Sequence, residues 1–147
     1  MSPQELERYL QRQIPLSHAM QVRVTEVSEE SVTLTAPLAP NRNHHATVFG
    51  GSASALAILS AWSLLHVRLQ ASYPDSRIVI QRHQMHFVHP IEAAVSARST
   101  LSVPQQWPVF LKMLARRGKA RIAIDATLVS AAQTAASFRG EYVAFEH

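Results

Sequence analysis

The stretch that decides the fold is residues 52–70, "SASALAILSAWSLLHVRLQ". Drawn as a helix, it carries apolar side chains on nearly every side, whereas a surface helix keeps them on one face. Such a helix has to be enclosed by other elements, so we expect it at the centre of the domain. Its apolar residues are Leu56, Ile58, Leu59, Trp62, Leu64, Leu65, Val67 and Leu69.

The segments around this helix have the pattern of strands. Apolar and polar residues alternate in residues 20–28 and 31–38, which predicts a hairpin. The same alternation returns in residues 76–103, where a proline breaks the run into two strands, and in residues 120–130 and 134–147. The chain therefore supplies about six strands around one buried helix, which favours an antiparallel sheet wrapped around it.

Two further helices are expected. Ser2 and Glu5 form a capping box around Pro3, a residue suited to the first helical position, which predicts an N-terminal helix. A short helix is expected within residues 105–119, ending at Gly118. We find no internal repeat and no linker, so residues 1–147 are expected to form a single α+β domain.

Composition limits the class of protein. The chain has 147 residues, of which 47% are apolar and 16% charged, as in folded globular domains. The longest mostly apolar stretch, residues 53–65, is short for a membrane span, and the charged N-terminus does not resemble a signal peptide. No cysteine is present, which excludes disulfides and a cysteine nucleophile. We expect a cytoplasmic protein without membrane insertion.

The net charge of +4 has a local origin. Arg116, Arg117, Lys119 and Arg121 lie close together in the sequence. Such a cluster can attract phosphates, an acidic carrier protein or nucleic acid, although a solvated turn is equally consistent with it. Because no nucleic-acid-binding motif accompanies the cluster, nucleic-acid binding is not expected.

The stretch "APLAPNRNHHATVFGGSASALAILSAW" at residues 36–62 resembles the hotdog-fold thioesterases, and within them the thioesterase group called the YiiD carboxy-terminal domain. The similarity extends to residues 10–24 and to the last two strands. The resemblance implies a long antiparallel sheet curled around a central helix. It also implies homodimers with the sheets joined edge to edge, and interfacial sites for acyl groups carried on coenzyme A or acyl carrier protein. No cofactor or metal is implied.

The glycine pair is the first candidate for the chemistry. Thioester hydrolysis needs a polarised carbonyl and a positioned water. Gly50 and Gly51 stand where the central helix begins, where unpaired N–H groups and the helix dipole favour an oxyanion. We assign the oxyanion-binding role to Gly50 with Gly51 in support. Alternatively, the glycines only permit a sharp turn.

The polar loop before the glycines supplies further candidates. Asn43 lies six residues before Phe49, the spacing of a polar side chain that precedes the glycines in the related thioesterases. It is a candidate for holding the water or the carbonyl, although Asn is also a favoured turn residue. Asn41 is the weaker alternative. His44 and His45 are candidate general bases, since histidine titrates near neutral pH, but exposed loop histidines are common.

Two positions depart from the resemblance. Phe49 stands in place of the histidine of the better-known His-Gly-Gly pattern, and Ile58 stands where many of these enzymes carry a carboxylate. The base that activates water is therefore not identified. The residues that we expect to contact the substrate, its acyl chain or its phosphates are Asn41, Phe49, Ser52, Ser60, Trp62, Arg116, Arg117 and Lys119. Ser52 is also a candidate helix cap.

Histidines in the third strand run do not predict a metal site. His83 and His89 share one face of a strand and His86 faces the other. Asp125 lies in an apolar strand and is best interpreted as a surface-facing position.

Two functions are consistent with the sequence. The first is a homodimeric thioesterase acting on acyl-CoA or acyl-carrier-protein thioesters. The second, motivated by the absent helix carboxylate, is a non-catalytic domain that binds acyl thioesters or acyl carriers. A hotdog dehydratase is disfavoured, because neither its usual histidine nor its helix acid is present.

Overall fold

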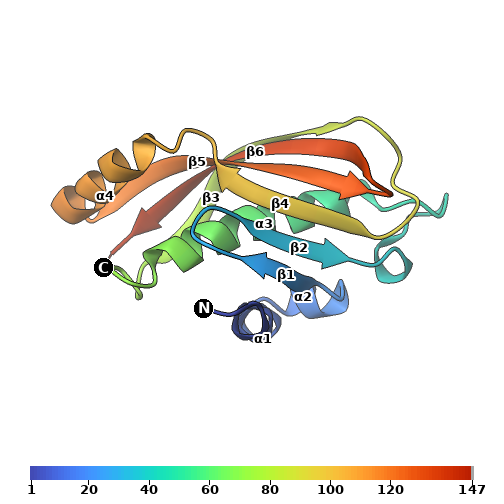
Figure 1. Cartoon of the computed structure of the whole chain (residues 1–147), viewed down its shortest axis with the longest axis horizontal. Coiled ribbons are helices and arrows are strands. Elements are labelled where there is room, and N and C mark those ends of the chain that lie inside the picture. The colour runs from blue at the N-terminus through green and yellow to red at the C-terminus, as the bar shows by residue number, and fades with distance from the viewer. Residues whose placement is uncertain (147) are drawn as a thin grey trace.

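The computed structural model describes residues 1–146 and has the predicted α+β architecture. A six-stranded antiparallel sheet, in the order β1-β2-β4-β5-β6-β3, curls around helix α3 (Gly50–Leu69), with α1 (Pro3–Gln13) at the N-terminus (Figure 1). The remaining elements are α2 (Pro15–Ala19), β1 (Arg23–Val27), β2 (Val32–Ala36), the short 3-10 helix η1 (Ala39–Asn41), β3 (Arg77–Phe87), β4 (Val95–Leu101), α4 (Gln106–Arg117), β5 (Lys119–Ser130) and β6 (Gln133–Phe145).

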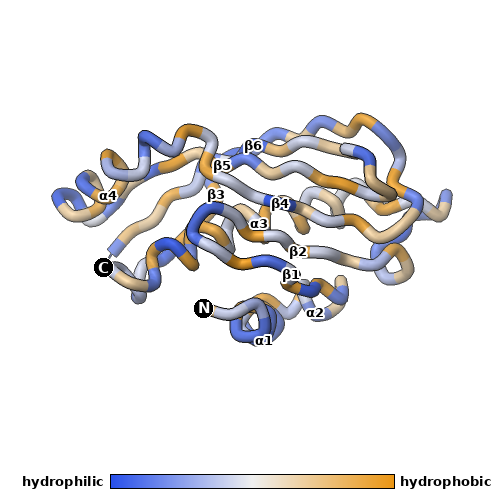
Figure 2. Tube along the Cα trace, viewed as in Figure 1, coloured by the Kyte–Doolittle hydropathy of each residue, from blue (hydrophilic) through white to orange (hydrophobic). Residues whose placement is uncertain are grey.

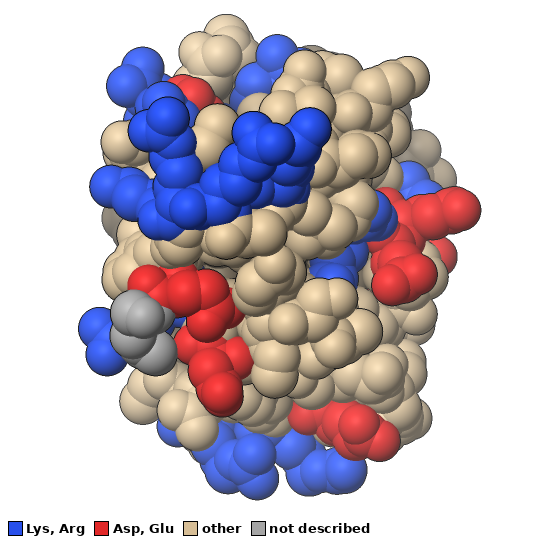
Figure 3. Space-filling model, turned by 90° about the vertical axis from the view of Figure 1, so that its left-hand side faces the viewer, with Lys and Arg blue, Asp and Glu red and all other residues tan. Residues whose placement is uncertain are grey.

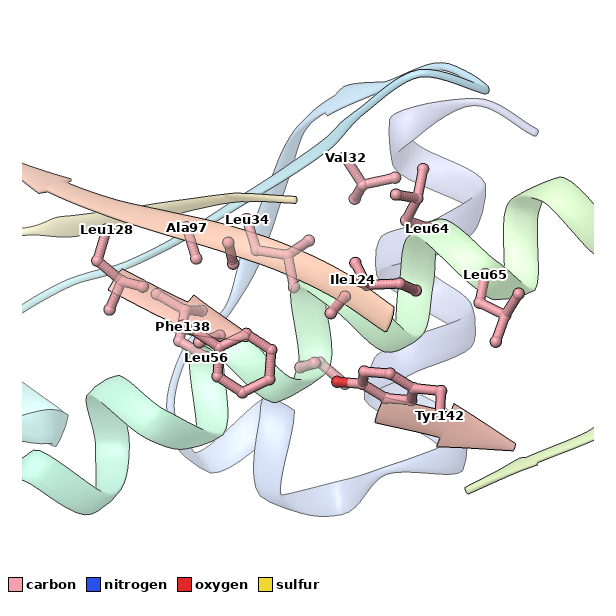
Figure 4. Close-up of a cluster of buried hydrophobic side chains, with 14 of the residues drawn as sticks. Val32, Leu34, Leu56, Leu64, Leu65, Ala97, Ile124, Leu128, Phe138 and Tyr142 are labelled. Carbon is pink, nitrogen blue, oxygen red and sulfur yellow. The ribbon is translucent and has the colours of Figure 1, made fainter. Parts of the chain in front are cut away.

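Helix α3 is the centre of the hydrophobic core, as its all-round apolar pattern predicts. Leu56, Leu64 and Leu65 are completely buried, and side chains of β2, β4, β5 and β6 point toward them (Figure 4). The hydroxyl of Tyr142 donates a 2.7 Å hydrogen bond to the carbonyl of Ile58, which ties β6 to the helix. Burial raises the pKa of Tyr142, so this hydroxyl stays a neutral donor.

The full helix is longer than its most apolar stretch. With 20 residues, α3 is long and apolar enough to cross a membrane, contrary to the expectation from residues 53–65. However, most of its apolar stretch is buried inside the domain, as in a core helix. Along the enclosing strands, hydrophobic and hydrophilic residues alternate, so that one face of the sheet is hydrophobic and packs against α3 (Figure 2).

The two edges of the sheet differ. Edge strand β1 is covered by α1. Ser2 caps this helix as predicted, because its hydroxyl accepts a hydrogen bond from the N–H of Glu5. The Glu7 carboxylate accepts a 2.9 Å hydrogen bond from the N–H of Val24 and so occupies part of that edge. Edge strand β3 has 11 residues, none of them buried, and its only neighbour in the described chain is β6.

Helix α4 packs on the sheet at the start of β5. Its buried residues are Phe110 and Leu114, and the Arg68 guanidinium stacks 4.2 Å above the Trp107 ring, which joins α4 to the end of α3. Gly118 terminates the helix in the left-handed conformation with φ 68°, as the sequence predicts.

Candidate active site

The N-terminus of α3 presents free backbone donors. The first hydrogen bond of the helix runs from the N–H of Ala53 to the carbonyl of Phe49. Within residues 1–146 no acceptor lies on the N–H groups of Gly50, Gly51 or Ser52, and no side chain caps the helix. Three donors and the positive end of a 20-residue helix therefore point toward one place.

The two glycines differ in what a side chain would contact. Neither Gly50 nor Gly51 has a positive φ, so the backbone does not require glycine for a turn. A Cβ on Gly51 would overlap the Phe49 ring, whereas a Cβ on Gly50 would lie 3.7 Å from Cζ of Phe87, an ordinary contact. The protein's own packing thus tolerates a side chain at residue 50, and its absence keeps the amide accessible.

A cavity opens beside Gly50. It has a volume of about 350 Å³, and its walls come from the start of α3, the end of β3 and the following loop. His89 is the titratable side chain in its lining, and hydrogen bonds from the N–H groups of Val88 and His89 to the carbonyl of Ala135 fix the loop. The sequence draws attention to His89 only as a metal ligand. The other lining residues are Val48, Phe87, Val88, Pro90 and Ile91.

Asn43 holds the polar loop closed. Its Oδ1 accepts hydrogen bonds from the N–H groups of His45 (2.8 Å) and Thr47 (3.2 Å), and its Nδ2 donates to the Thr47 hydroxyl (2.8 Å). The carbonyl of Thr47 also accepts from the N–H of Asn43 at 2.7 Å. This is the turn role considered as the alternative for Asn43, and it fixes the approach to the glycine pair.

Asn41 is the structural anchor beneath the same loop. It is 2% exposed, and its Nδ2 donates to the carbonyls of Met20 (2.9 Å) and Pro37 (2.8 Å). Its own carbonyl accepts a 2.7 Å hydrogen bond from the N–H of Phe49, the residue before α3. Asn41 therefore sets where the helix begins. Phe49 itself is exposed beside the glycines.

His44 and His45 lie at the exposed tip of this loop. Their ring centroids are 3.8 Å apart, and neither lines the cavity beside Gly50. The structure thus brings His89 to the glycine pair and leaves the two predicted histidines on the loop surface. No spacing rule links His89 to Gly50 in the sequence, because the β3–β6 pairing and the loop after β3 create their proximity.

A second cavity lies farther along α3. This apolar chamber has a volume of about 290 Å³, and its lining includes Trp62 and Ile58, the position where the resemblance leads us to expect a carboxylate. Ala55, Ile58 and Trp62 lie on one face of the helix, so the chamber extends from near the glycine pair to a point about 18 Å along the axis. The other lining residues are Ile14, Leu16, Ser17, Met20, Leu59, Ile80 and Tyr142.

Trp62 is the lining residue of the apolar chamber that lies farthest along α3. Its Nε1 donates a 3.1 Å hydrogen bond to the carbonyl of Ile78 on β3, and its ring stacks on His66 with centroids 4.9 Å apart. His66 in turn stacks on Tyr9 of α1 at 4.6 Å. Burial lowers the pKa of His66, which keeps this ring neutral between its aromatic neighbours.

The two serines expected to contact substrate lie in different surroundings. Ser52 is the third residue of α3, so its interpretation as the helix cap was wrong, because Phe49 is the N-cap. Ser60 is completely buried, and its hydroxyl is 3.0 Å from the carbonyls of both Val32 and Ala97. It joins α3 to β2 and β4 rather than facing either cavity.

Arg116 and Arg117 end α4 and Lys119 begins β5, at the opposite end of the molecule from the start of α3 (Figure 1). Within one chain they do not meet the glycine pair. Asp125 faces the outer surface of the sheet, where Arg139 forms an ion pair with it at 2.7 Å and, with Ser102, lowers its pKa against the effect of burial. No candidate metal-binding cluster occurs among residues 1–146.

The family model described as "Putative thioesterase (yiiD_Cterm)" matches residues 3–146. The chain belongs to this family. Among solved structures, a Chlorobaculum tepidum protein of unknown function has a TM-score of 0.92 at 23% identity, with 99% of this chain and 94% of that chain covered. A Shewanella oneidensis protein, described as a putative thioesterase, has a TM-score of 0.82 at 26% identity, with 98% and 97% covered.

A Pseudomonas aeruginosa protein of unknown function, described as a probable thioesterase, has a TM-score of 0.83 at 20% identity, with 99% of this chain and 97% of that chain covered. These similarities confirm the hotdog fold, and family membership assigns the chain to thioester hydrolysis as a general class of reaction.

Proposed function

We propose that the protein hydrolyses acyl thioesters of coenzyme A or acyl carrier protein, with the carbonyl held at the N-terminus of α3. The observation that carries the proposal is the set of free N–H groups at Gly50, Gly51 and Ser52, together with the cavity that Gly50 lines. Donors placed in this way stabilise the oxyanion that forms when water attacks a thioester carbonyl.

The absence of a carboxylate on α3 requires another base, and His89 is the best placed. Its imidazole takes a proton from water as the water oxygen bonds to the carbonyl carbon, and the oxyanion develops toward the N–H groups of Gly50 and Gly51. When the carbon–sulfur bond breaks, the imidazolium returns the proton to the leaving thiolate. The products are a carboxylic acid and a thiol.

The apolar chamber suits the acyl group. It begins one turn after the glycine pair and contains almost only apolar side chains, so burial of an acyl chain there is favourable. Ile58 contributes to this wall instead of a carboxylate. The proposed site therefore separates the chemistry at Gly50 from acyl binding farther along the same helix.

We further propose that two copies join through β3. An 11-residue edge strand with half-exposed Val79 and Phe87 is a surface that another strand can pair with. β3 contributes Phe87 to the cavity beside Gly50 and Ile80 to the apolar chamber, so an edge-to-edge dimer would place both cavities at its interface.

A two-fold axis through the middle of β3 would pair the strands antiparallel, with the start of one beside the end of the other. Because Lys119 lies in register with the start of β3 through β6, the partner's Lys119 would then lie toward this chain's Gly50. In this arrangement Arg116, Arg117 and Lys119 serve the active site of the other copy.

A non-catalytic acyl-thioester-binding domain is the second candidate, and Ile58 is the observation that favours it. A panel of acyl-CoA substrates with short, long and aromatic acyl groups, monitored through release of free thiol, separates the two. Turnover supports the hydrolase. Saturable binding of the same compounds without thiol release would instead support the binding domain.

A further inference from the structure

A groove separate from both cavities lies between α4 and the outer face of the sheet. We call it the α4 groove; its volume is about 430 Å³. One wall is Val109 and Met113 of α4, which are 56% and 41% exposed, and apolar Ala120 and Val143 contribute from the sheet. The remaining lining residues are Gln81, Gln106, Phe110, Lys119 and Arg121.

Several contacts hold α4 in place beside the groove. Trp107 stacks on Phe110 with centroids 5.1 Å apart, and the Arg68 guanidinium carbon lies 4.2 Å from the centroid of the Trp107 ring. Leu114 is buried, and Gly118 fixes the turn into β5. Helix α4 therefore holds Val109 and Met113 apart from the core although both are apolar. Because the helix is already formed, a partner that covers these residues does not incur the entropic cost of ordering it.

The segment of chain that forms α4 and the start of β5 beside the groove is basic. Residues 93–124 contain no Asp or Glu, and within residues 1–146 none of the five lysines and arginines around the groove forms an ion pair. Figure 3 shows Lys and Arg side chains forming a band across this end of the molecule. Lys119 and Arg121 line the groove, and Lys112, Arg116 and Arg117 lie on α4, which forms one of its walls.

We propose that the α4 groove docks an acidic amphipathic helix of the acyl carrier protein that delivers the thioester, an inference that rests on the proposed function. The occupant must supply negative charge for these lysines and arginines, and apolar side chains for Val109 and Met113, which an amphipathic acidic helix does at once. A free phosphate uses the cations but gains nothing from the apolar wall. A bilayer cannot enter a slot between a helix and a sheet.

The position of the groove agrees with delivery to the active site. Gln81 of β3 lies in the groove and its amide oxygen accepts a 3.0 Å hydrogen bond from Arg121, so the groove extends to the open sheet edge. In the proposed dimer, the groove of one copy lies toward the glycine pair of the other. A docked carrier protein is then beside the interface into which its acyl-bearing arm must extend.

The test measures binding of a purified bacterial acyl carrier protein in its unacylated phosphopantetheine form, by calorimetry on the full chain. R116E/R117E reverses the charge at the end of α4, V109S/M113S removes the apolar wall, and R8E/R12E makes the same charge change on α1 as a matched control. We expect each groove variant to weaken binding by about tenfold or more and the control by less than about twofold. Circular dichroism verifies that all variants are folded.

Binding that is absent in the wild-type protein, or equal in V109S/M113S and wild type, overturns the proposal. It is also overturned if R116E/R117E raises the KM for acyl-CoA without weakening carrier-protein binding, or if the wild type binds phosphatidylglycerol vesicles and not the carrier protein. Because the assay needs no hydrolysis, carrier binding without thiol release refutes the hydrolase alone. Acyl-CoA turnover without carrier binding refutes the groove alone.

Discussion

The two edges of the sheet are treated in opposite ways. At β1 the chain closes its own edge: α1 lies along the strand, the Glu7 carboxylate occupies the N–H of Val24, and the strand has only five residues. At β3 the edge is 11 residues long and is left uncovered by the described chain. Proteins usually protect such edges from pairing, so an edge left open beside one that is covered indicates a surface meant for pairing.

The largest effect is expected when pairing at β3 is broken. Adjacent residues of a strand point their N–H groups to opposite sides, and proline removes the N–H. Of H83P and Q84P, one therefore removes a donor toward β6 and the other a donor toward the open edge. We expect the variant that loses the donor toward the open edge to be monomeric and its turnover to fall by about 100-fold or more, because both cavities would no longer lie at the proposed interface.

Light scattering gives the mass of each variant, and urea unfolding shows which of the pair weakens the β3–β6 ladder. A wild-type protein that is monomeric and active would contradict the proposed interface. So would a pair of prolines that both leave the dimer and its turnover intact.

The next effect concerns His89, at the loop where the open edge ends. H89Q removes the proposed base while keeping a polar side chain of similar size, and we expect kcat/KM to fall by about 100-fold, the usual range for loss of a general base. H44Q and H45Q are matched controls because their rings lie outside the cavity, and we expect each to stay within about twofold of wild type. A larger loss in either control would return the base to the polar loop.

A smaller loss of activity, about tenfold, is expected for G50A. The new Cβ makes only an ordinary contact with Phe87 in the protein but enters the space where the carbonyl is proposed to bind. Because residue 50 has a helical backbone, the same change is expected to stabilise the fold by about 0.5 kcal/mol. Thermal unfolding and thiol release, measured on one sample, test whether the variant is both more stable and less active. Lower stability with unchanged turnover would mean that the glycine is structural.

The fold could be predicted because its main signal is local. An all-round apolar segment, a capping box at Ser2 and the terminating Gly118 each determine their element within a few residues, and all three elements are confirmed. Of the candidate site, only the backbone N–H groups at the start of α3 could be predicted from the sequence. Gly50 and Gly51 mark the helix start, but the choice between a turn and an open amide depends on φ and on the distance to Phe87.

The remaining parts of the site arise from contacts distant in sequence. His89 reaches the cavity because its loop is bound to Ala135, and Asn43 is occupied by Thr47 and His45, which spacing alone does not reveal. Ser60 looked available on a helix but lies beneath β2 and β4. A polar residue on an all-round apolar helix can serve the core or a ligand, and only the surrounding sheet decides which.

On the covered edge, the expected effects are on stability rather than on activity. E7A leaves the N–H of Val24 without its carboxylate partner, and we expect a loss of about 1 kcal/mol in the free energy of unfolding. E7Q keeps an oxygen acceptor and is expected to recover most of that loss. Urea unfolding of the pair measures the difference, and equal stability of the two variants would show that the hydrogen bond contributes nothing.

The smallest effect is a pH dependence of stability that arises in the aromatic stack between α3 and α1. His66 stacks between Trp62 and Tyr9, and burial lowers its pKa below the ordinary value of 6.5. Below pH 6.5 the unfolded chain therefore takes up a proton that the folded protein refuses, so stability falls as the pH decreases from 6.5 toward the lowered pKa. The loss between pH 7.5 and 5.5 is expected to be about 1 kcal/mol or less. H66F keeps an aromatic ring in the stack but removes the titrating group, so its free energy of unfolding should decrease less over the same pH interval. An identical decrease in H66F and wild type would show that another group causes the loss of stability at low pH.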